Sequence, residues 1–378
     1  MFDTKSRIHI SAGLPRVSIL PFSKVIEQII YDLKNEQNPE ILQYGFASGY
    51  ERFRKILADF IGEKEGRVVN PRHLFVTNGA THGILLSIIA LSGKKKASII
   101  ERPTYFPLID LFRELNLDLY FVDVDEHGIS TEGIKQILSK ARTDKVFIHC
   151  TPYFQNPTRF NVSAPRMHKL LNIVEHNNKI WPLLDNVYKY LSFSQSPISS
   201  LFDFSLRRVI KVNSFSKIFG PGLRIGWIET DELTIGKIEE SGYVQSSGGF
   251  NPFICRSLER IILSGFINDI INKWITFLAN KQSDLVRDLQ SIFPEAEYTR
   301  PDGGYYLWVN FKNHLLSNST FREFVKNKMN VVYVPGTKCA GSPNLYQTYT
   351  RLGFATYKND ELTQGLSRLK VAFNEFTK

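Results

Sequence analysis

The sequence has few cysteines and no long apolar run. Its three cysteines, Cys150, Cys255 and Cys339, lie far apart, and neither they nor the eight histidines show metal-ligand spacing. This composition favours a reducing, cytoplasmic compartment and argues against a metal site. The longest apolar-rich stretch, residues 83–91, is too short to span a bilayer. The charged N-terminus lacks the apolar core of a signal peptide, so we expect no membrane association.

The chain also lacks internal repeats, low-complexity tracts and a Pro/Ser-rich linker. Its formal net charge is +10, but the basic residues are scattered, and Lys94–Lys96 form the densest run. We therefore expect no nucleic-acid partner, although a basic surface suits small anionic substrates. A length of 378 residues allows two domains, or one large domain with a sizeable core.

Short apolar runs alternate with amphipathic stretches through the middle of the chain. The runs that predict strands are residues 73–77, 97–100, 117–124, 145–150, 180–184, 207–214 and 223–228. The stretches that predict helices are residues 80–91, 107–115, 131–141 and 164–177. Continuous apolar strands that alternate with helices indicate an α/β fold, with a mostly parallel sheet covered by helices on both faces.

The C-terminal third has a different pattern. A long helical pattern over residues 251–291 is followed by strand-like runs at 304–311, 331–334 and 348–352 and by a final helix after Asn359. The segment before residue 40 contains one amphipathic helix that we expect to pack against this part. We therefore predict a large domain over residues 41–250, and a smaller α+β domain formed by residues 1–40 and 251–378.

Polar clusters follow five of the predicted strands. They begin at Thr77, Glu101, Thr151, Asp185 and Ser214. Because open α/β sheets bind ligands at the carboxyl ends of their strands, we expect these clusters to converge on one site.

The run Ser214–Arg224 (SFSKIFGPGLR) carries the most specific chemistry. Lys217 lies just past a strand end, where a fixed lysine could meet a ligand, and Ser214 and Arg224 could hold an anion. A lysine that bonds a carbonyl, beside a hydroxyl and a guanidinium that hold a phosphate, is what pyridoxal phosphate requires. A surface lysine in a Ser/Gly/Pro turn is the alternative interpretation.

The chain resembles the class I/II pyridoxal-phosphate aminotransferases of fold type I. The resemblance rests on the order and spacing of Asn156 in QNP, Asp185 with Tyr188, the lysine of SFSK and Arg224, and it extends from near the start of the chain to Arg351. Each of these motifs alone would be weak evidence for the family.

The resemblance implies a role for each matching residue. Lys217 would bind the cofactor covalently and move a proton, and Asp185 would pair with the pyridine nitrogen. Tyr188 and Asn156 would hydrogen-bond the phenolic oxygen of the cofactor, and Tyr105 would stack on its ring. These assignments make Lys217, Asp185 and Tyr188 the predicted catalytic residues.

The remaining roles concern the phosphate and the substrate. The phosphate site would combine a helix N-terminus with a hydroxyl and a guanidinium; its residues are Gly79, Ala80, Thr81, Ser214 and Arg224. Tyr44 matches a tyrosine that reaches the phosphate of the neighbouring subunit, which implies a homodimer with shared sites. The substrate carboxylate would bind Arg351 and Asn156, and Gly13 would let the backbone approach the substrate.

From the residues alone, simpler interpretations stay open. They are a helix cap for Asp185, a turn for Asn156, core packing for Tyr105, a plain helix start at Gly79–Thr81, an aromatic in a turn for Tyr44 and a cross-strand ion pair for Arg351. One position departs from the family pattern: Arg159 stands where glycine is usual after Asn-Pro-Thr. It would be strained if the position needs a positive φ, and it would reshape the loop or place a charge near the site entrance.

The predicted activity is a ping-pong transfer of the α-amino group to a 2-oxo acid such as 2-oxoglutarate. The pattern is nearest to the branch that acts on 2-aminoadipate, aromatic and kynurenine-type amino acids. A C–S β-lyase or an aminocyclopropane-carboxylate synthase-like enzyme would keep the same residues. A non-catalytic ligand-sensing protein is a further alternative; Lys217 and Asp185 argue against it, as does the short segment before the matching region.

Overall fold

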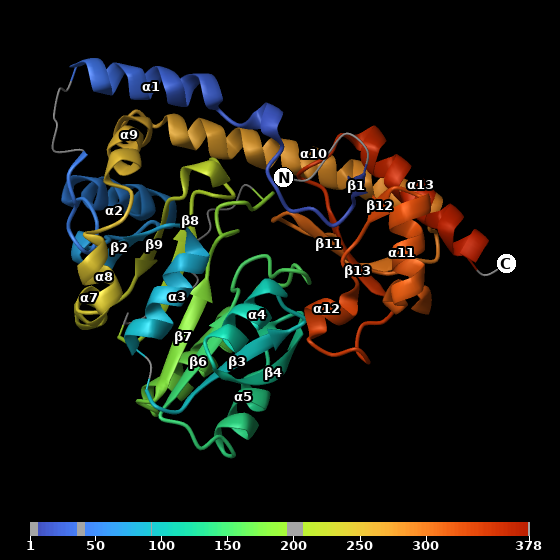
Figure 1. Ribbon diagram of the computed structural model, residues 1–378, viewed down its shortest axis with the longest axis horizontal. Coiled ribbons are helices and arrows are strands. Elements are labelled where there is room, and N and C mark those ends of the chain that lie inside the picture. Colours follow the sequence, from blue (N-terminus) through green and yellow to red (C-terminus); the bar gives the residue numbers. More distant parts are fainter. Residues whose placement is uncertain (1–6, 36–41, 92, 195–206, 377–378) are drawn as a thin grey trace.

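An eight-stranded sheet forms the centre of the computed structural model, which describes residues 7–35, 42–91, 93–194 and 207–376 (Figure 1). The strand order is β2-β9-β8-β7-β6-β3-β4-β5. The strands are β2 (Leu74–Thr77), β3 (Lys96–Arg102), β4 (Asp118–Asp125), β5 (Gly128–Ile129), β6 (Lys145–Cys150), β7 (Ile180–Asp185), β8 (Ile210–Ser214) and β9 (Gly226–Glu229). The pairs β7–β8, β6–β7, β3–β6 and β3–β4 are parallel, which confirms the predicted α/β class.

Strand β9 is antiparallel to both of its neighbours, β2 and β8. It begins at Gly226 rather than at residue 223, because Pro221–Leu223 form a short 3-10 helix and Arg224 has a φ of +54°. The strand before it begins at Ile210 rather than at 207, since Arg208 has a φ of +61° that no strand tolerates. Because β9 runs opposite to both neighbours, β2 and β8 are parallel and their carboxyl ends share one edge.

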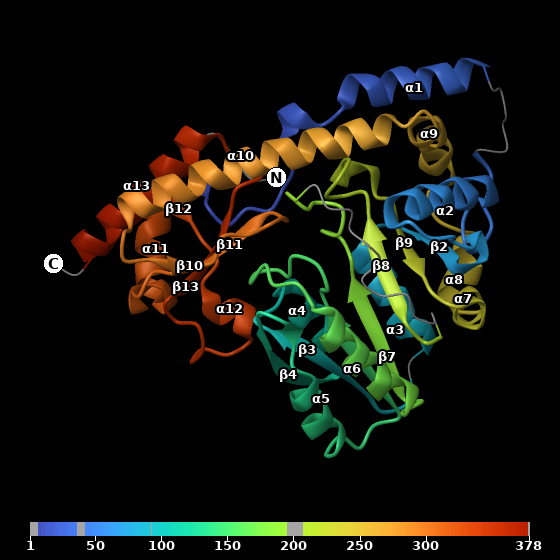
Figure 2. The same ribbon diagram turned by 180° about the vertical axis from the view of Figure 1, so that it is seen from behind.

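Helices cover both faces of the sheet. In Figure 1, α3 (Ala80–Leu91) lies in front of the sheet, and in Figure 2, the view from behind, α6 (Ala164–Glu175) lies in front. The other helices of this part are α2 (Glu51–Glu65), α4 (Pro107–Glu114), α5 (Thr131–Leu138), α7 (Glu232–Glu239) and α8 (Gly242–Ser247). Several begin at a side-chain cap; the hydroxyls of Ser130 and Ser163 accept from the amides of Gly133 and Arg166.

The strands are buried on both faces. Along β6, Phe147 packs into one hydrophobic cluster, whereas Val146 and Ile148 pack into the cluster on the other face. Complete burial of such side chains stabilises the fold by about 1.5–3 kcal/mol each. This two-sided core fixes the strand ends, and with them the residues that follow.

The described residues of the C-terminal part form two small sheets and a group of helices around them. A three-stranded antiparallel sheet consists of β10 (Glu297–Tyr298), β11 (Tyr306–Asn310) and β13 (Tyr349–Gly353). The two-stranded sheet pairs β1 (Ile8–His9) with β12 (Val331–Val332) in parallel. The helices are α10 (Phe266–Ile292), α11 (Ser319–Lys328), α12 (Gly336–Ala340) and α13 (Asn359–Phe376), grouped around these sheets in Figure 1.

The expectation of one helix over residues 251–291 was wrong. Two helices, α9 (Pro252–Leu263) and α10, meet at an angle of 82°, because Gly265 adopts a φ of +74° between them. Within the described residues, no single helix is long and apolar enough to cross a membrane; this bent pair meets the length and composition criteria only when taken together.

The N-terminal segment contacts both parts of the molecule. Strand β1 pairs with β12, and Gly353 donates its amide hydrogen to the carbonyl of Ile10. The amphipathic helix α1 (Phe22–Asn35) packs on α9, where the Arg260 guanidinium lies 3.8 Å from the ring centroid of Tyr31. The domain boundaries near residues 40 and 250 stay a prediction.

Candidate active site

A cavity of about 630 Å³ lies at the carboxyl edge of the large sheet, between the strand ends and the C-terminal part. Its walls combine residues from the strand-end clusters with residues of the N-terminal segment, β12, α12 and β13. The predicted site residues that line it are Gly13, Gly79, Ala80, Thr81, Tyr105, Asn156, Asp185, Tyr188, Ser214, Lys217, Arg224 and Arg351. The structure thus brings together groups from five strand ends and from both termini of the chain.

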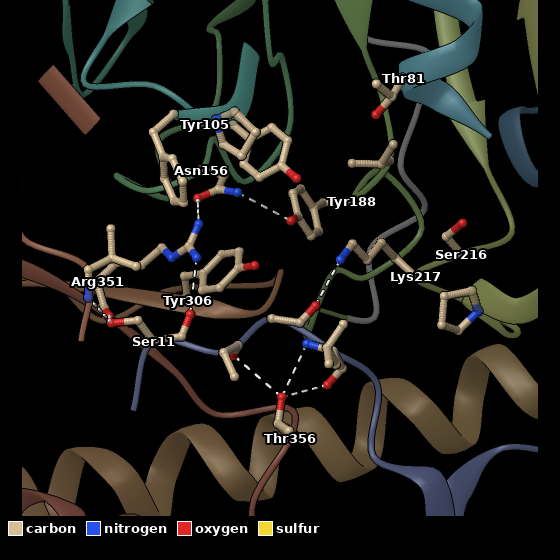
Figure 3. A pocket seen from close by; sticks show the side chains of 18 of the residues that line it. Ser11, Thr81, Tyr105, Asn156, Tyr188, Ser216, Lys217, Tyr306, Arg351 and Thr356 are labelled. Atoms are coloured by element: carbon tan, nitrogen blue, oxygen red, sulfur yellow. Dashed lines mark hydrogen bonds between the residues drawn. The ribbon is translucent and has the colours of Figure 1, made fainter. Parts of the chain in front are cut away.

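Lys217 lies in the turn after β8 and points into the cavity (Figure 3). Its Nζ donates to the carbonyl oxygen of Gly13 at 2.8 Å. The backbone carbonyl oxygen of Lys217 accepts a hydrogen bond from the Tyr305 hydroxyl at 2.6 Å. Burial lowers the pKa of Lys217, the charge of Arg351 lowers it further, and Tyr306 and Asp185 act in the opposite direction. A lysine in this environment loses its proton more readily than one in water, which favours attack on a carbonyl carbon.

Asp185 is the last residue of β7, and its side chain is only 13% exposed. Its Oδ1 accepts from the amide of Val187 at 3.3 Å, and its Oδ2 lies 3.9 Å from Nε2 of the buried His149. A carboxylate at this depth is stabilised by a cationic or N–H partner in the cavity, because an unpaired buried charge is costly.

Behind Asp185 lies a second buried carboxyl group, Glu101, at the end of β3. Its Oε2 accepts from the amide of Thr151 at 3.1 Å and from Nε2 of Gln155 at 3.3 Å. Burial raises the pKa of Glu101 to about 7, although His149 and these hydrogen bonds act in the opposite direction. Sequence analysis placed Glu101 in a strand-end cluster but gave it no role.

Asn156 connects two other site residues. Its Oδ1 accepts from Nη1 of Arg351 at 2.8 Å, and its Nδ2 lies 3.5 Å from the Tyr188 hydroxyl (Figure 3). Arg351 also donates from Nη2 to the carbonyl of Ser11 at 3.0 Å, while its buried Nε has no partner among the described residues. The guanidinium is therefore held in place with donor capacity left over, as a carboxylate-binding arginine requires.

The opposite end of the cavity is suited to an anion. Helix α3 begins at Ala80, so the amides of its first turn and the positive end of its dipole face the cavity beside Thr81. Arg224 donates from Nη2 to the carbonyl of Asn78 at 2.6 Å, and the Ser214 hydroxyl contacts Ser216 Oγ at 2.8 Å. A Cβ on Gly79, whose φ is +98°, would lie 2.8 Å from Arg224 Nη2, so glycine is needed for this approach.

Two residues from the sequence analysis lie outside the lining of the cavity. Tyr44 is 80% exposed, and its ring packs over Gly248. Arg159 has a φ of +70°, so the position does have the positive φ that usually selects glycine. The Arg159 guanidinium lies 5.2 Å from the ring centroid of Phe160, and Arg159 is not among the residues that line the cavity.

Sequence analysis missed several residues that line the cavity, and Tyr306 is central among them. The Arg351 guanidinium lies 4.1 Å from its ring centroid, and its ring meets Tyr188 edge to face at 6.1 Å. Burial alone would raise the pKa of Tyr306, but the charges of Arg351 and Lys217 outweigh burial and lower it. The other missed residues include Ser11, Ser216, Lys338 and Thr356. The only sequence signal for Tyr306 was its place in a predicted strand.

The family model for aminotransferase class I and II matches residues 8–369. The chain belongs to this family. The match covers the whole cavity lining, so the family and the geometry concern the same site. The protein is therefore an aminotransferase of the class that uses pyridoxal phosphate.

Named relatives resemble the aminotransferase over almost its full length. It is 24% identical to aromatic-amino-acid aminotransferase 1 of Thermococcus litoralis, over 99% of this chain and 90% of that protein. It is 25% identical to 2-aminoadipate transaminase of Thermus thermophilus, over 95% of this chain and 88% of that protein. A solved kynurenine aminotransferase from Pyrococcus horikoshii has a TM-score of 0.86 and 24% identity, with 99% of this chain and 92% of that chain covered. This likeness shows the fold type I architecture.

The residues of the aminotransferase site fit pyridoxal phosphate. Helix α3 and Arg224 form a cradle that a side chain at position 79 would fill, which suits the phosphate. Among the described residues of the lining, Asp185 supplies the one carboxylate, and Lys217 supplies a buried amine. The cavity volume of about 630 Å³ is in the range of small-molecule sites.

Proposed function

We propose that this aminotransferase moves the α-amino group of 2-aminoadipate, an aromatic amino acid or a similar donor to a 2-oxo acid such as 2-oxoglutarate, by a ping-pong mechanism. The observation that carries the proposal is the arrangement of Arg351 and Lys217 in one cavity. Among the described residues, the buried Nε of Arg351 has no hydrogen-bond partner, and the Nζ of Lys217 donates to the backbone carbonyl of Gly13. Such a pair can bind the carboxylate of an amino acid and act on the neighbouring carbon.

Arg351 orients the substrate in this proposal. Its guanidinium is buried, Asn156 and Ser11 hold it on two sides, and Tyr306 lies under its face. A bidentate bond to the α-carboxylate fixes the substrate Cα near Lys217, and lysine could not reproduce this fork. The bonds of Arg351 to Asn156 and Ser11 persist while its remaining N–H groups donate to the substrate carboxylate.

Lys217 is the residue that moves the proton. Pyridoxal phosphate, when bound, supplies an electron-accepting ring conjugated with the carbon that receives the amino group. The Lys217 Nζ would hold the cofactor and, once released by the substrate, would be placed to accept and return the proton of the substrate Cα. The lowered pKa of Lys217 supports this role, because only the neutral amine can accept a proton.

The other assigned residues hold the cofactor. Asp185 would pair with the ring nitrogen and keep it protonated, and Tyr188 and Asn156 would hydrogen-bond the ring oxygen. Tyr105 would pack against the ring. Ser214, Arg224 and the first turn of α3 at Gly79, Ala80 and Thr81, which all line the cavity, would hold the phosphate.

We also propose a homodimer in which Tyr44 reaches the site of the neighbouring subunit. Three side chains of one short segment are exposed and apolar: Leu42 by 80%, Tyr44 by 80% and Phe46 by 66%. On α1, Phe22 is 72% exposed and Ile30 47%. Apolar groups this exposed support a subunit interface around the entrance of the site.

One experiment distinguishes transamination from the other reactions that this fold supports. The purified holoenzyme is mixed with one donor at a time, in the absence of acceptor, and the cofactor absorbance is followed. We expect conversion to the amine form with at least one donor, and recovery of the aldehyde form on addition of 2-oxoglutarate. Pyruvate or ammonia released without the amine form would indicate a β-lyase, and no spectral change with any donor would favour a ligand-sensing protein.

Two controls test the site assignment. Borohydride reduction followed by peptide mass analysis should place the cofactor on Lys217, and an adduct on another lysine would contradict the assignment. Light scattering of the holoenzyme should give twice the chain mass of 43.4 kDa. A monomer that retains full activity would overturn the shared-site proposal.

A further inference from the structure

Positively charged side chains outnumber acidic ones among the described residues that line the cavity. Among the described residues of the lining, four side chains are cationic and one is acidic. Three cations have roles in the proposed function: Lys217 binds the cofactor, Arg224 its phosphate and Arg351 the α-carboxylate. Asp185, the single acid, pairs with the ring nitrogen. Lys338 is left without a role, and its positive charge is not compensated by any acid of the lining.

Lys338 lies on α12, on the side of the cavity opposite the sheet. Its Nζ is 4.9 Å from the ring centroid of Phe106, and within the described parts of the chain it forms no ion pair with a carboxylate. The Arg351 guanidinium is 6.0 Å from the same centroid. The two cationic groups therefore cannot be further apart than the sum of these distances, about 11 Å.

A small dicarboxylate is long enough to span this upper limit. The terminal carboxyl carbons of an extended five-carbon chain lie about 5 Å apart, given C–C bonds of about 1.5 Å. A charge-assisted hydrogen bond at each end adds about 2.8 Å, so the total reach is about 11 Å. A five- or six-carbon dicarboxylate can therefore reach both cations, whereas a three-carbon monocarboxylate has only one anionic end to offer them.

Apolar side chains share the lining with the two cations. They include Phe106, whose ring lies near both cationic groups, and Pro107, Val332 and Val334. Methylene groups pack well on such surfaces, while a charged group there would be desolvated without a partner. The lining therefore offers two cations and apolar surface, which together suit the two carboxylates and the methylene groups of a dicarboxylate.

We propose that Lys338 binds the side-chain carboxylate of a dicarboxylic 2-oxo acid or amino acid, and so makes the enzyme selective for five- and six-carbon dicarboxylates. The proposal rests on the proposed function, since it places the α-carboxylate on Arg351. It assigns the substrate class to a named residue of this chain. Lys338 acts in specificity and does not touch the reacting carbon.

The test compares two acceptors of similar size and different charge. 2-Oxoglutarate carries the second carboxylate, and 2-oxohexanoate replaces it with an uncharged terminus. In Lys338→Met, kcat/KM for 2-oxoglutarate should fall at least tenfold more than kcat/KM for 2-oxohexanoate, mainly through KM, and Lys338→Arg should recover most of the difference. Lys326→Met on α11, an exposed lysine outside the cavity, controls for the loss of one positive charge.

A binding measurement separates this proposal from the proposed function. Calorimetry of the holoenzyme with glutarate and with pentanoate needs no turnover. We expect glutarate to bind the wild type more tightly than pentanoate, and Lys338→Met to remove that preference. An equal loss of kcat/KM for both acceptors, no loss of kcat/KM for either, or an unchanged affinity for glutarate would overturn the role of Lys338. Absence of transamination with every donor would refute the proposed function, while the glutarate result would still report on Lys338.

Discussion

Replacement of Gly13 by alanine tests how tightly the site is assembled. A Cβ at this position would lie 1.6 Å from the Tyr306 hydroxyl oxygen and 2.5 Å from the ring carbon that bears it. These distances are far below van der Waals contact, so either the N-terminal segment or the Tyr306 ring must move. The carbonyl of the same glycine accepts the hydrogen bond from Lys217 Nζ, so a shift is transmitted to the catalytic amine.

The N-terminal segment has little freedom to move. The Thr356 hydroxyl bonds the carbonyl of Leu14 at 2.7 Å and accepts its amide hydrogen at 3.1 Å, as Figure 3 shows. On the other side, the backbone of Ala12 lies so close to Gly353 that a Cβ there would be 1.9 Å from the Ala12 carbonyl oxygen. The Tyr306 ring must therefore move, and with it the guanidinium of Arg351 that it supports.

We expect two measurable effects of Gly13→Ala. Overpacking of this kind costs about 1–3 kcal/mol of stability. A displacement of the order of 1 Å at the reacting groups costs about 100-fold in rate, equivalent to about 2.7 kcal/mol of activation free energy. kcat/KM for the best donor should therefore fall about 100-fold, while the melting temperature falls by only a few degrees.

The matched control is Gly222→Ala in the turn after Lys217. An added Cβ there meets no atom within 4 Å, so activity should stay within about twofold of wild type. Equal activity of the two variants would refute the reasoning, because it would show that the contact between Gly13 and Tyr306 does not constrain the site.

Two further predictions concern buried charges. Arg351→Lys should raise KM for amino donors about 100-fold with a smaller effect on kcat, because lysine cannot form the two-pronged bond to the α-carboxylate that we propose for arginine. Steady-state kinetics tests this. A decrease in kcat larger than the increase in KM would contradict it. Glu101 has a pKa raised from 4.5 to about 7, so its folded form binds the proton more tightly than its unfolded form. The resulting stability is fully present below about pH 4.5 and is lost as the pH rises through about 7, by about 3 kcal/mol. Urea unfolding of Glu101→Gln should lack this component of the wild-type pH dependence, and parallel curves for the two proteins would show that Glu101 keeps an ordinary pKa.

The sequence predicted which strand-end residues lie together in the cavity, for a physical reason. Buried parallel strands read as continuous apolar runs, and the polar residues after them must meet at one edge of the sheet. Asp185 and Ser214 end their strands as expected, and Ala80 opens α3 as expected. The strand order alone predicts that these residues lie close together, and the C-terminal part of the chain is not needed for that prediction.

Residues on the C-terminal side of the cavity could not be assigned in this way. Tyr305 and Tyr306 are adjacent aromatics at the start of one strand, and alternation places them on opposite faces without saying which face meets the cavity. In the structure Tyr305 bonds the backbone of Lys217, while Tyr306 lies against Arg351. The break at Gly265 escaped prediction similarly, because the helical periodicity continues through it and only the positive φ marks the turn.

The placement of Tyr188 shows a further limit of local patterns. The two residues that follow it, Lys189 and Tyr190, both contact Glu65 at the end of α2, at 2.6 Å and 3.0 Å. Arg67 connects Glu65 to Glu229 of β9, with Nη1 2.6 Å from that carboxylate. Glu65 and Arg67 are far in the sequence from Lys189 and Glu229, and none of these residues belongs to a motif.

Burial of this network adds little net stability by itself, since desolvation offsets most of the attraction between the charges. Its effect is on the position of side chains. The Glu65 carboxylate contacts the two residues that follow Tyr188. We therefore expect it to keep the Tyr188 phenol 3.5 Å from Asn156, and Asn156 in its bond to Arg351. We therefore expect the ion network around Glu65 to help position Tyr188, Asn156 and Arg351 in the cavity.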